Sequence, residues 1–210
     1  MKIIIIGIGS TAYAVSELLD LDSNFKLVGF IGTTEEAGRI KNGSLIHKRT
    51  PLLGDHSILP RLKEGGILGF VVAIGDNCIR EAAFYEACSH GLVPINLVSS
   101  KAIVDNSVKF TQGVIVSPGV IISPGVEIGS NTILDPGVIV GVNCFIGENC
   151  YLHAGVVICA GSRIEKNVMV SARAVIGPDI TVGKNQLVDA GKVVSTSLGR
   201  LYREDKRDDS

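Results

Sequence analysis

A period of six residues runs through the second half of this chain and constrains its fold more than any other feature. From Val104 to Val194 every sixth residue is bulky and apolar, without a break over sixteen positions. A period of six fits short strands joined by turns and excludes an α-helix, whose period is 3.6. Two residues before many of these positions stands a mostly small side chain, as at Val114, Val120, Val126, Thr132, Cys144, Cys150, Ser162 and Ala174.

Three such hexapeptides close one triangular coil, so the repeat predicts a parallel β-helix of about five coils over residues 99–199. The bulky residues should fill the prism and the small ones its corners. At Gln186 and Lys192 a large polar side chain takes the place of the small one, as often happens in terminal repeats. The charged tail at 200–210 has no apolar period and is expected to be frayed.

Residues 1–98 alternate between apolar runs and helical patterns, which predicts an α/β, Rossmann-like domain with a parallel sheet. We expect strands at 2–6, 25–31, 69–74 and 93–97, and helices at 12–21 and 79–88. Gly7 and Gly9 directly follow the first strand, where glycines let the backbone approach a phosphate at a helix amino terminus. The alternative is that the same two glycines only permit a tight turn.

The composition argues against several classes of protein. A net charge of −1 without a basic stripe argues against nucleic-acid binding. The opening apolar run is too short to cross a bilayer, and no signal peptide precedes it. Five cysteines without a CxxC pair indicate a cytoplasmic protein with reduced thiols and no metal. His153 is the only histidine in the repeat region, whereas a γ-type carbonic anhydrase needs three there.

An α/β domain followed by a hexapeptide β-helix resembles the acetyltransferases of bacterial nucleotide-sugar pathways, of the bacillosamine, sialic acid and perosamine type. The marks here are Gly7-Ile8-Gly9-Ser10, the stretch Ala73-Ile74-Gly75-Asp76-Asn77 followed by Arg80, and the unbroken repeat. The resemblance implies a left-handed coil, a homotrimer, and acetyl-CoA as co-substrate between neighbouring β-helices. It also implies a nucleotide-linked sugar bound by the first domain, with the contacts Gly7, Gly9, Ser10, Thr11, Gly75, Asp76 and Asn77.

The same resemblance places the acyl-CoA on the later coils. The run Ser171-Ala172-Arg173-Ala174 matches a family segment rich in glycine and alanine, and Arg173 and Lys184 could meet the CoA phosphates. Corner packing and a solvated charged face are the alternatives for these residues. Outward apolar residues would be costly in water and support the trimer: Ile115, Ile121, Ile133 and Ile139.

Two positions that carry histidine in the family carry other residues here. Val142 occupies the place of the general base, and valine cannot move a proton. Tyr151 occupies the place of a second frequent histidine. The fold transfers from the resemblance, and the chemistry transfers only in part.

The first domain departs from the family as well. Thr11 stands where the family often has histidine, and Gly32 and Thr33 stand where it often has acidic residues. The lack of an acidic residue at the end of the second strand makes a dinucleotide such as NAD a weaker interpretation. Glu35 and Glu36 come slightly late for that role.

The repeat itself suggests a replacement base. Residues 18 apart stack in a column at about 4.8 Å per coil, so His153 should lie beside Asp135 and Ser171 and point outwards. A carboxylate next to an imidazole fixes its tautomer and raises its basicity. We therefore hypothesise that Asp135 orients His153 as the catalytic base. A solvated surface histidine is one alternative, and catalysis by positioning alone is another.

Together these features predict an acetyl-CoA-dependent acyltransferase that acts on the amine of a nucleotide-linked amino sugar in surface-polysaccharide biosynthesis. Two other functions stay open: a non-catalytic nucleotide- or sugar-binding member of the fold, and an O-acyltransferase.

Overall fold

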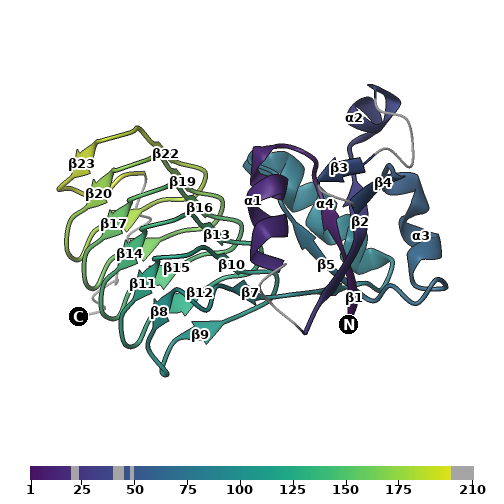
Figure 1. Ribbon diagram of the computed structural model, residues 1–210. Helices are drawn as coiled ribbons and strands as arrows, with labels where there is room; N and C mark the ends of the chain where they lie inside the picture. The colour runs from purple at the N-terminus through teal and green to yellow at the C-terminus, as the bar shows by residue number, and fades with distance from the viewer. Residues whose placement is uncertain (20–23, 40–44, 48–49, 200–210) are drawn as a thin grey trace, which may run out of the picture.

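The computed structural model describes residues 1–19, 24–39, 45–47 and 50–199, which form an α/β domain and a β-helix side by side (Figure 1). The first domain holds a six-stranded sheet in the order β3-β4-β2-β1-β5-β6. Its strands are β1 (Lys2–Ile6), β2 (Lys26–Ile31), β3 (Leu45–His47), β4 (Thr50–Gly54), β5 (Gly69–Val72) and β6 (Val93–Pro94). Its helices are α1 (Ser10–Leu19), α2 (Thr34–Arg39), the 3-10 helix η1 (His56–Ile58), α3 (Leu59–Leu62) and α4 (Asn77–Ser89).

Strand β1 lies at the centre of this sheet because its four isoleucines can be buried on both faces. It pairs in parallel with β2 on one side and β5 on the other, and Ile3 to Ile6 are fully buried. The strands predicted at 2–6, 25–31 and 69–74 are confirmed within two residues, as is the helix at 79–88. The helix predicted at 12–21 begins earlier, at Ser10, and residues 20 and 21 lie outside the described residues.

Each strand of the β-helix contains two residues, and strands 18 residues apart pair in parallel, as Ile133 does with Tyr151. The strands are β7 (Leu97–Val98), β8 (Ile103–Val104), β9 (Lys109–Phe110), β10 (Ile115–Val116), β11 (Ile121–Ile122), β12 (Glu127–Ile128), β13 (Ile133–Leu134), β14 (Ile139–Val140), β15 (Phe145–Ile146), β16 (Tyr151–Leu152), β17 (Val157–Ile158), β18 (Arg163–Ile164), β19 (Met169–Val170), β20 (Val175–Ile176), β21 (Thr181–Val182), β22 (Leu187–Val188) and β23 (Val193–Val194). From β8 onwards the second residue of each pair packs in the core of the prism, so the repeat predicted from Val104 to Val194 is confirmed.

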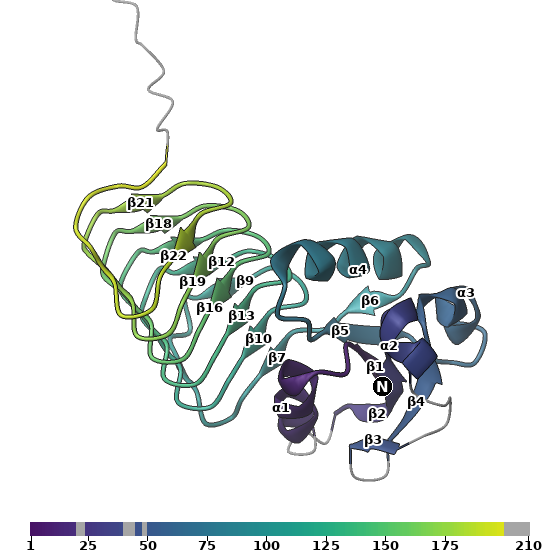
Figure 2. The same ribbon diagram turned by 90° about the horizontal axis from the view of Figure 1, so that it is seen from above.

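The strands form three faces of a triangular prism, visible from above in Figure 2. The first face contains β7, β10, β13, β16, β19 and β22; the second contains β8, β11, β14, β17, β20 and β23; the third contains β9, β12, β15, β18 and β21. We call the turns from the first to the second face the first corner, those from the second to the third face the second corner, and those leading back to the first face the third corner.

The strand predicted at 93–97 is instead two strands in different sheets. Strand β6 ends at Pro94, after which the N–H of Ile95 still donates to the carbonyl of Phe70 in β5, and β7 opens the first coil by pairing with β10. The Asn96 side chain lies between them, donates to the carbonyl of Thr111 and accepts from the N–H of Val114. These bonds turn the chain from the first domain directly into the β-helix.

Asparagines form a ladder along the third corner. Asn131, Asn149, Asn167 and Asn185 all have φ between 55° and 61°, a left-handed conformation that asparagine tolerates better than most residues. The side-chain amides of the first three each donate to the side-chain oxygen of the next asparagine at 2.8 Å. The ladder therefore satisfies the turn geometry and links successive coils.

The α/β domain covers the early coils of the first face of the β-helix, with α1 beside them (Figures 1 and 2), whereas Leu187 of β22 on the same face is exposed. Ile115 and Ile133 are only 1% exposed and share a core with residues of α1 and β1. The prediction that these two isoleucines lie open for subunit contact is therefore wrong, because the chain's own first domain packs on them. Ile121 and Ile139, on the second face, are exposed as predicted.

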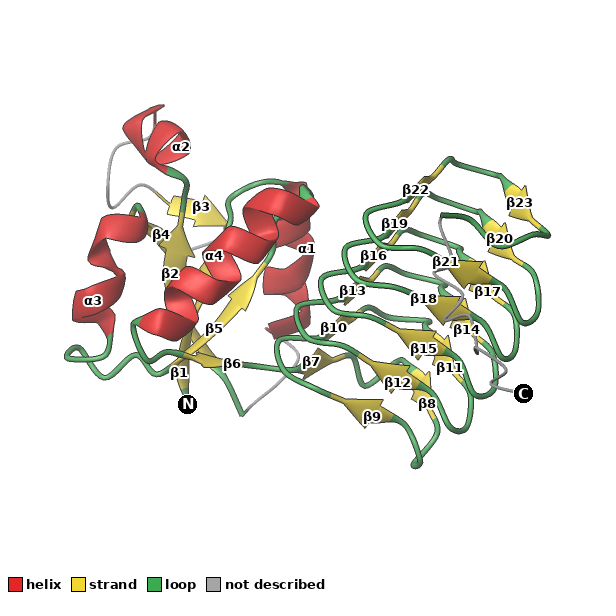
Figure 3. Ribbon diagram, turned by 180° about the vertical axis from the view of Figure 1, so that it is seen from behind, coloured by secondary structure: helices red, strands yellow, loops and turns green. Residues whose placement is uncertain are grey.

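Figure 3 shows the two domains from behind, with α4 running towards the early coils of the β-helix. Among the described helices, none combines the length and the apolar character that crossing a bilayer requires.

Candidate functional site

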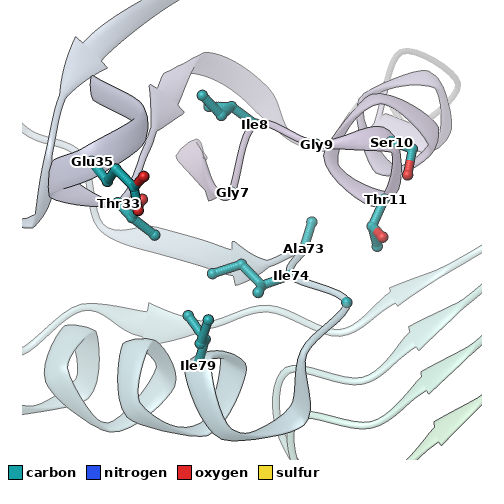
Figure 4. A pocket seen from close by; sticks show the side chains of 11 residues that line it. Gly7, Ile8, Gly9, Ser10, Thr11, Thr33, Glu35, Ala73, Ile74 and Ile79 are labelled. Carbon is teal, nitrogen blue, oxygen red and sulfur yellow. The ribbon is translucent and has the colours of Figure 1, made fainter. Parts of the chain in front are cut away.

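A cavity of about 380 Å³ lies at the carboxyl ends of β1, β2 and β5 (Figure 4). This is where the sheet's chain order reverses, since β1 is flanked by β2 on one side and β5 on the other. Ligands of α/β sheets bind at such a switch point, and the volume suits a small molecule. The lining residues are Gly7, Ile8, Gly9, Ser10, Thr11, Thr33, Glu35, Ala73, Ile74, Gly75 and Ile79.

The two glycines of the loop after β1 have different tasks. Gly7 has φ +118°, and a Cβ there would lie 2.5 Å from the carbonyl oxygen of Ala73. Only glycine therefore lets the ends of β1 and β5 approach this closely. Gly9 has open space on its Cβ side, and its carbonyl accepts from the N–H of Tyr13 as α1 begins. The tight turn is thus real, and the space beside Gly9 is available to a ligand.

Most residues predicted to contact a substrate do line this cavity: Gly7, Gly9, Ser10, Thr11 and Gly75. Asp76 and Asn77 do not. Asp76 caps α4, because its side chain accepts from the N–H of Ile79 at 2.9 Å. Asn77 is buried, and its side-chain oxygen accepts from Arg80 Nη2 at 2.6 Å. The structure gives these two residues a capping and a packing task, and their contact with substrate stays a prediction.

Two polar residues of the cavity wall were not assigned from the sequence. Thr33 follows β2, and Glu35 lies in the first turn of α2, which begins at Thr34. Among the lining residues in the described part of the chain, Glu35 is the only charged one. An acidic side chain therefore lines the cavity two residues beyond Thr33, on a short helix. The side chain of Glu36 lies outside the described residues.

Arg80 clamps the cavity wall to the β-helix. This fully buried residue of α4 donates through Nη1 to the carbonyls of Ile74 and Gly75, which belong to the cavity. Through Nε and Nη2 it donates to the carbonyls of Asn131 and Asn149 at the third corner. Burial lowers the pKa of Arg80 to about 10. The loop after β5 is therefore held in a fixed place against the coils.

The column predicted around His153 is confirmed in its geometry. His153 Nδ1 lies 3.2 Å from Asp135 Oδ2, one coil away, and the two side chains are 31% and 23% exposed. Both residues lie at the first corner, directly after β16 and β13. An imidazole whose Nδ1 faces a carboxylate, and whose side chain is still partly exposed, can accept a proton through Nε2. Its catalytic role stays a prediction.

Tyr151 connects this pair to the cavity. Its hydroxyl donates to Asp135 Oδ1 at 3.3 Å, and its ring stacks on His153 with centroids 4.0 Å apart. Burial raises the pKa of Tyr151, the charge of Asp135 adds to the rise, and a side-chain hydrogen bond from Thr11 opposes it. Thr11 lines the cavity, so the cavity wall and the His153–Asp135 pair are neighbours in one subunit.

The residues predicted to bind CoA fall at two separate corners. Ser171, Ala172 and Arg173 lie at the first corner, one coil beyond His153, where the N–H of Arg173 donates to the carbonyl of Ala154. Lys184 lies at the third corner, so one subunit does not bring it together with Arg173.

Val142, which the resemblance places at the position of the family's base, lies at the second corner and is 43% exposed. His153 is therefore not a direct neighbour of that position in the same subunit.

Sequence comparison identifies each domain separately. Residues 2–87 match the PglD N-terminal domain. Residues 143–178 match the bacterial transferase hexapeptide family, and residues 161–196 match the hexapeptide repeat of succinyl-transferase. Among curated proteins, none matches the sequence.

Solved structures share the whole architecture. PerB from Caulobacter crescentus, in complex with CoA and GDP-perosamine, is 29% identical with a TM-score of 0.86, covering 94% of this chain and 90% of that one. A histidine variant of the perosamine N-acetyltransferase from Caulobacter crescentus, with the same ligands, matches at 29% identity, the same coverage and a TM-score of 0.87.

At lower identity the likeness shows the fold alone. WeeI from Acinetobacter baumannii AYE is 17% identical with a TM-score of 0.68, covering 95% of this chain and 97% of that one. These matches confirm the α/β domain followed by a left-handed parallel β-helix.

Proposed function

We propose that this chain transfers an acyl group from acyl-CoA to the amine of a nucleotide-linked sugar. The chain belongs to the nucleotide-sugar acetyltransferase family, with a PglD-type first domain and a hexapeptide β-helix. Acetyl-CoA is the proposed donor, because relatives covering nearly the whole chain were solved with CoA and GDP-perosamine. The modified sugar would serve surface-polysaccharide biosynthesis. One observation carries the proposal: a paired imidazole lies next to the wall of the glycine-loop cavity.

In this proposal the cavity holds the nucleotide end of the acceptor. The glycine loop and the first turn of α1 offer N–H groups and hydroxyls to phosphate oxygens, with Ser10 and Thr11 at the cavity wall. The Glu35 carboxylate accepts from donor groups of the nucleoside at the far side of the cavity (Figure 4). The sugar then extends past Thr11 towards the first corner of the β-helix.

At the first corner His153 acts as the general base. The neutral amine attacks the thioester carbonyl while Nε2 of His153 takes one of its protons. The N–C bond forms, the C–S bond breaks, and the imidazolium returns the proton to the sulfur of the departing CoA. The Asp135 carboxylate holds Nδ1–H and stabilises the imidazolium, while Ser171 and Arg173 flank the same corner for the acyl-CoA. Such a base contributes roughly 10²- to 10⁴-fold in rate.

The second face of the β-helix supports a homotrimer. Its outward column is apolar on successive coils: Ile103, Ile121, Ile139, Val157, Val175 and Val193. Ile103 and Val193 are 67% and 68% exposed, an arrangement that is costly in water and that neighbouring subunits would cover. A cytoplasmic location is proposed with it, since all five cysteines lie in the described residues as free thiols.

Titration calorimetry with acetyl-CoA is the first test, followed by an assay of thiol release with GDP-perosamine as acceptor. Saturable binding near one site per subunit, and turnover that falls roughly 10²- to 10⁴-fold in His153→Ala, would support the proposal. His90→Ala is the control, because His90 ends α4 away from the cavity lining and should leave turnover unchanged. Unchanged turnover in His153→Ala would remove the base and leave positioning as the source of catalysis.

A non-catalytic, nucleotide-binding role is the second candidate, and it is favoured by one observation. Val142, which the resemblance places at the position of the family's base, is exposed and can neither accept nor donate a proton. Failure to bind acetyl-CoA at millimolar concentration would favour this role, or another acyl donor. Turnover with a hydroxyl acceptor alone would instead indicate an O-acyltransferase.

A further inference from the structure

Tyr151 interrupts an apolar column on the first face of the β-helix. Its neighbours above and below in the described coils are Ile133 and Met169, and beyond them lie Ile115 and Leu187. The Tyr151 side chain is only 4% exposed and shares the core between the two domains. A buried phenol keeps its position only if its hydroxyl finds partners. Those partners reveal what the residue does.

The first partner is the carboxylate of Asp135. The Tyr151 hydroxyl donates to Oδ1 at 3.3 Å, and Oδ2 faces His153 Nδ1 at 3.2 Å. An ionised carboxylate only accepts hydrogen bonds, so one proton comes from the phenol and the other from the imidazole. This arrangement places the imidazole proton on Nδ1 and leaves the lone pair on Nε2, the atom that a general base uses.

The Tyr151 ring also fixes the plane of the imidazole. The two ring centroids are 4.0 Å apart and the planes differ by 28°, which is a stacked arrangement. Turning the imidazole about its Cβ–Cγ bond would break the stack and carry Nδ1 away from Asp135. Tyr151 therefore restrains both members of the pair, the carboxylate through its hydroxyl and the imidazole through its ring.

On its other side Tyr151 contacts the first domain. Its side chain shares an apolar core with Ala12 and Val15 of α1. Thr11, the residue before Ala12, lines the cavity at the end opposite Glu35 (Figure 4). Tyr151 therefore lies where the first domain meets the His153–Asp135 pair.

We infer that Tyr151 is a positioning residue: through Asp135 it fixes the tautomer of His153, and through its stacked ring it fixes the plane of the imidazole. Its use in catalysis rests on the proposed function. The tautomer itself is a property of the folded chain and can be measured without any substrate.

The test is ¹⁵N nuclear magnetic resonance of the histidine side chains, above the pH at which they titrate, with His153 assigned by its loss in His153→Gln. In the unaltered protein we expect His153 as the Nδ1–H tautomer. In Tyr151→Phe the Nδ1 and Nε2 resonances should move towards each other, as two tautomers become populated. Tyr85→Phe is the control, because Tyr85 is exposed on α4 and contacts neither His153 nor Asp135.

Two outcomes would contradict the inference. It is overturned if His153 is the Nε2–H tautomer in the unaltered protein. It is also overturned if Tyr151→Phe leaves the Nδ1 and Nε2 resonances of His153 in place.

These spectra are independent of turnover. A His153→Ala variant with full activity would reject the proposed base and leave the measured tautomer standing. Conversely, a mixed tautomer in the unaltered protein would overturn the positioning role even in an active enzyme.

Discussion

Arg80 offers the sharpest test of how the two domains are joined. Its guanidinium donates five hydrogen bonds, to four main-chain carbonyls and to the side chain of Asn77, and no carboxylate is among these acceptors. We expect Arg80→Leu to remove all five bonds and to leave the acceptors of both domains buried without a donor. The cavity loop and the third corner of the β-helix should then lose their common anchor.

The size of the effect follows from two opposing contributions. Hydrogen bonds from a charged donor contribute about 1.5 kcal/mol each at the low end of their range. Against them stands the cost of burying the charge: a pKa lowered from 12.5 to about 10 corresponds to about 3 kcal/mol. The net loss in the free energy of unfolding should therefore be about 4 kcal/mol, within the range for disrupting buried charged networks.

Urea denaturation and thermal unfolding, followed by circular dichroism, measure this loss, which should lower the melting temperature by roughly 10 °C for a chain of this size. Arg163→Leu is the matched control, since Arg163 is half exposed over the ring of Phe145 and should change stability by less than about 1 kcal/mol. An Arg80→Leu protein no less stable than Arg163→Leu would refute the reasoning, because the five bonds would then contribute nothing beyond the cost of burial.

Three further predictions concern pH, assembly and the cavity. Burial raises the pKa of Cys150 to about 12. Between about pH 9 and 12 the folded state therefore keeps the thiol proton of Cys150 while the unfolded state loses it. The free energy of unfolding should fall with rising pH over that range. Urea unfolding should show that the free energy of unfolding falls between pH 8.5 and 10.5, and that this fall is smaller by about 2 kcal/mol in Cys150→Ala than in the unaltered protein. Equal falls in the two proteins would contradict the raised pKa of Cys150. Ile139→Glu, on the exposed second face, should convert the proposed trimer to smaller species in light scattering, whereas Lys109→Glu on the third face should not. An Ile139→Glu protein that is still a trimer would exclude the second face as the subunit interface. Glu35→Ala should weaken binding of GDP-perosamine roughly 10- to 100-fold in calorimetry, and a change below twofold would place the carboxylate outside the nucleotide site.

The sequence determined the β-helix almost completely, because its information is local and periodic. A period of six fixes which residue of each pair points inwards, and a coil of three hexapeptides fixes which residues stack. The contact between His153 and Asp135 follows from that stacking alone. The separation of Arg173 and Lys184 follows from the same arithmetic, since the two residues do not differ by a multiple of 18.

Only the tertiary structure decided which face of the prism is covered. Ile115 and Ile121 have equivalent places in the repeat, yet one is buried and the other is 37% exposed, because the α/β domain packs on the first face and leaves the second open. Glu35 reaches the cavity because a short helix turns there after β2, and Asp76 leaves it because α4 uses the carboxylate as its cap. Tyr151 gained its contact with Thr11 through the docking of the two domains. Repeating hydrogen bonds between neighbouring coils are encoded position by position, whereas the docking of one domain on another depends on surfaces that are far apart in the chain and come together only in the folded molecule.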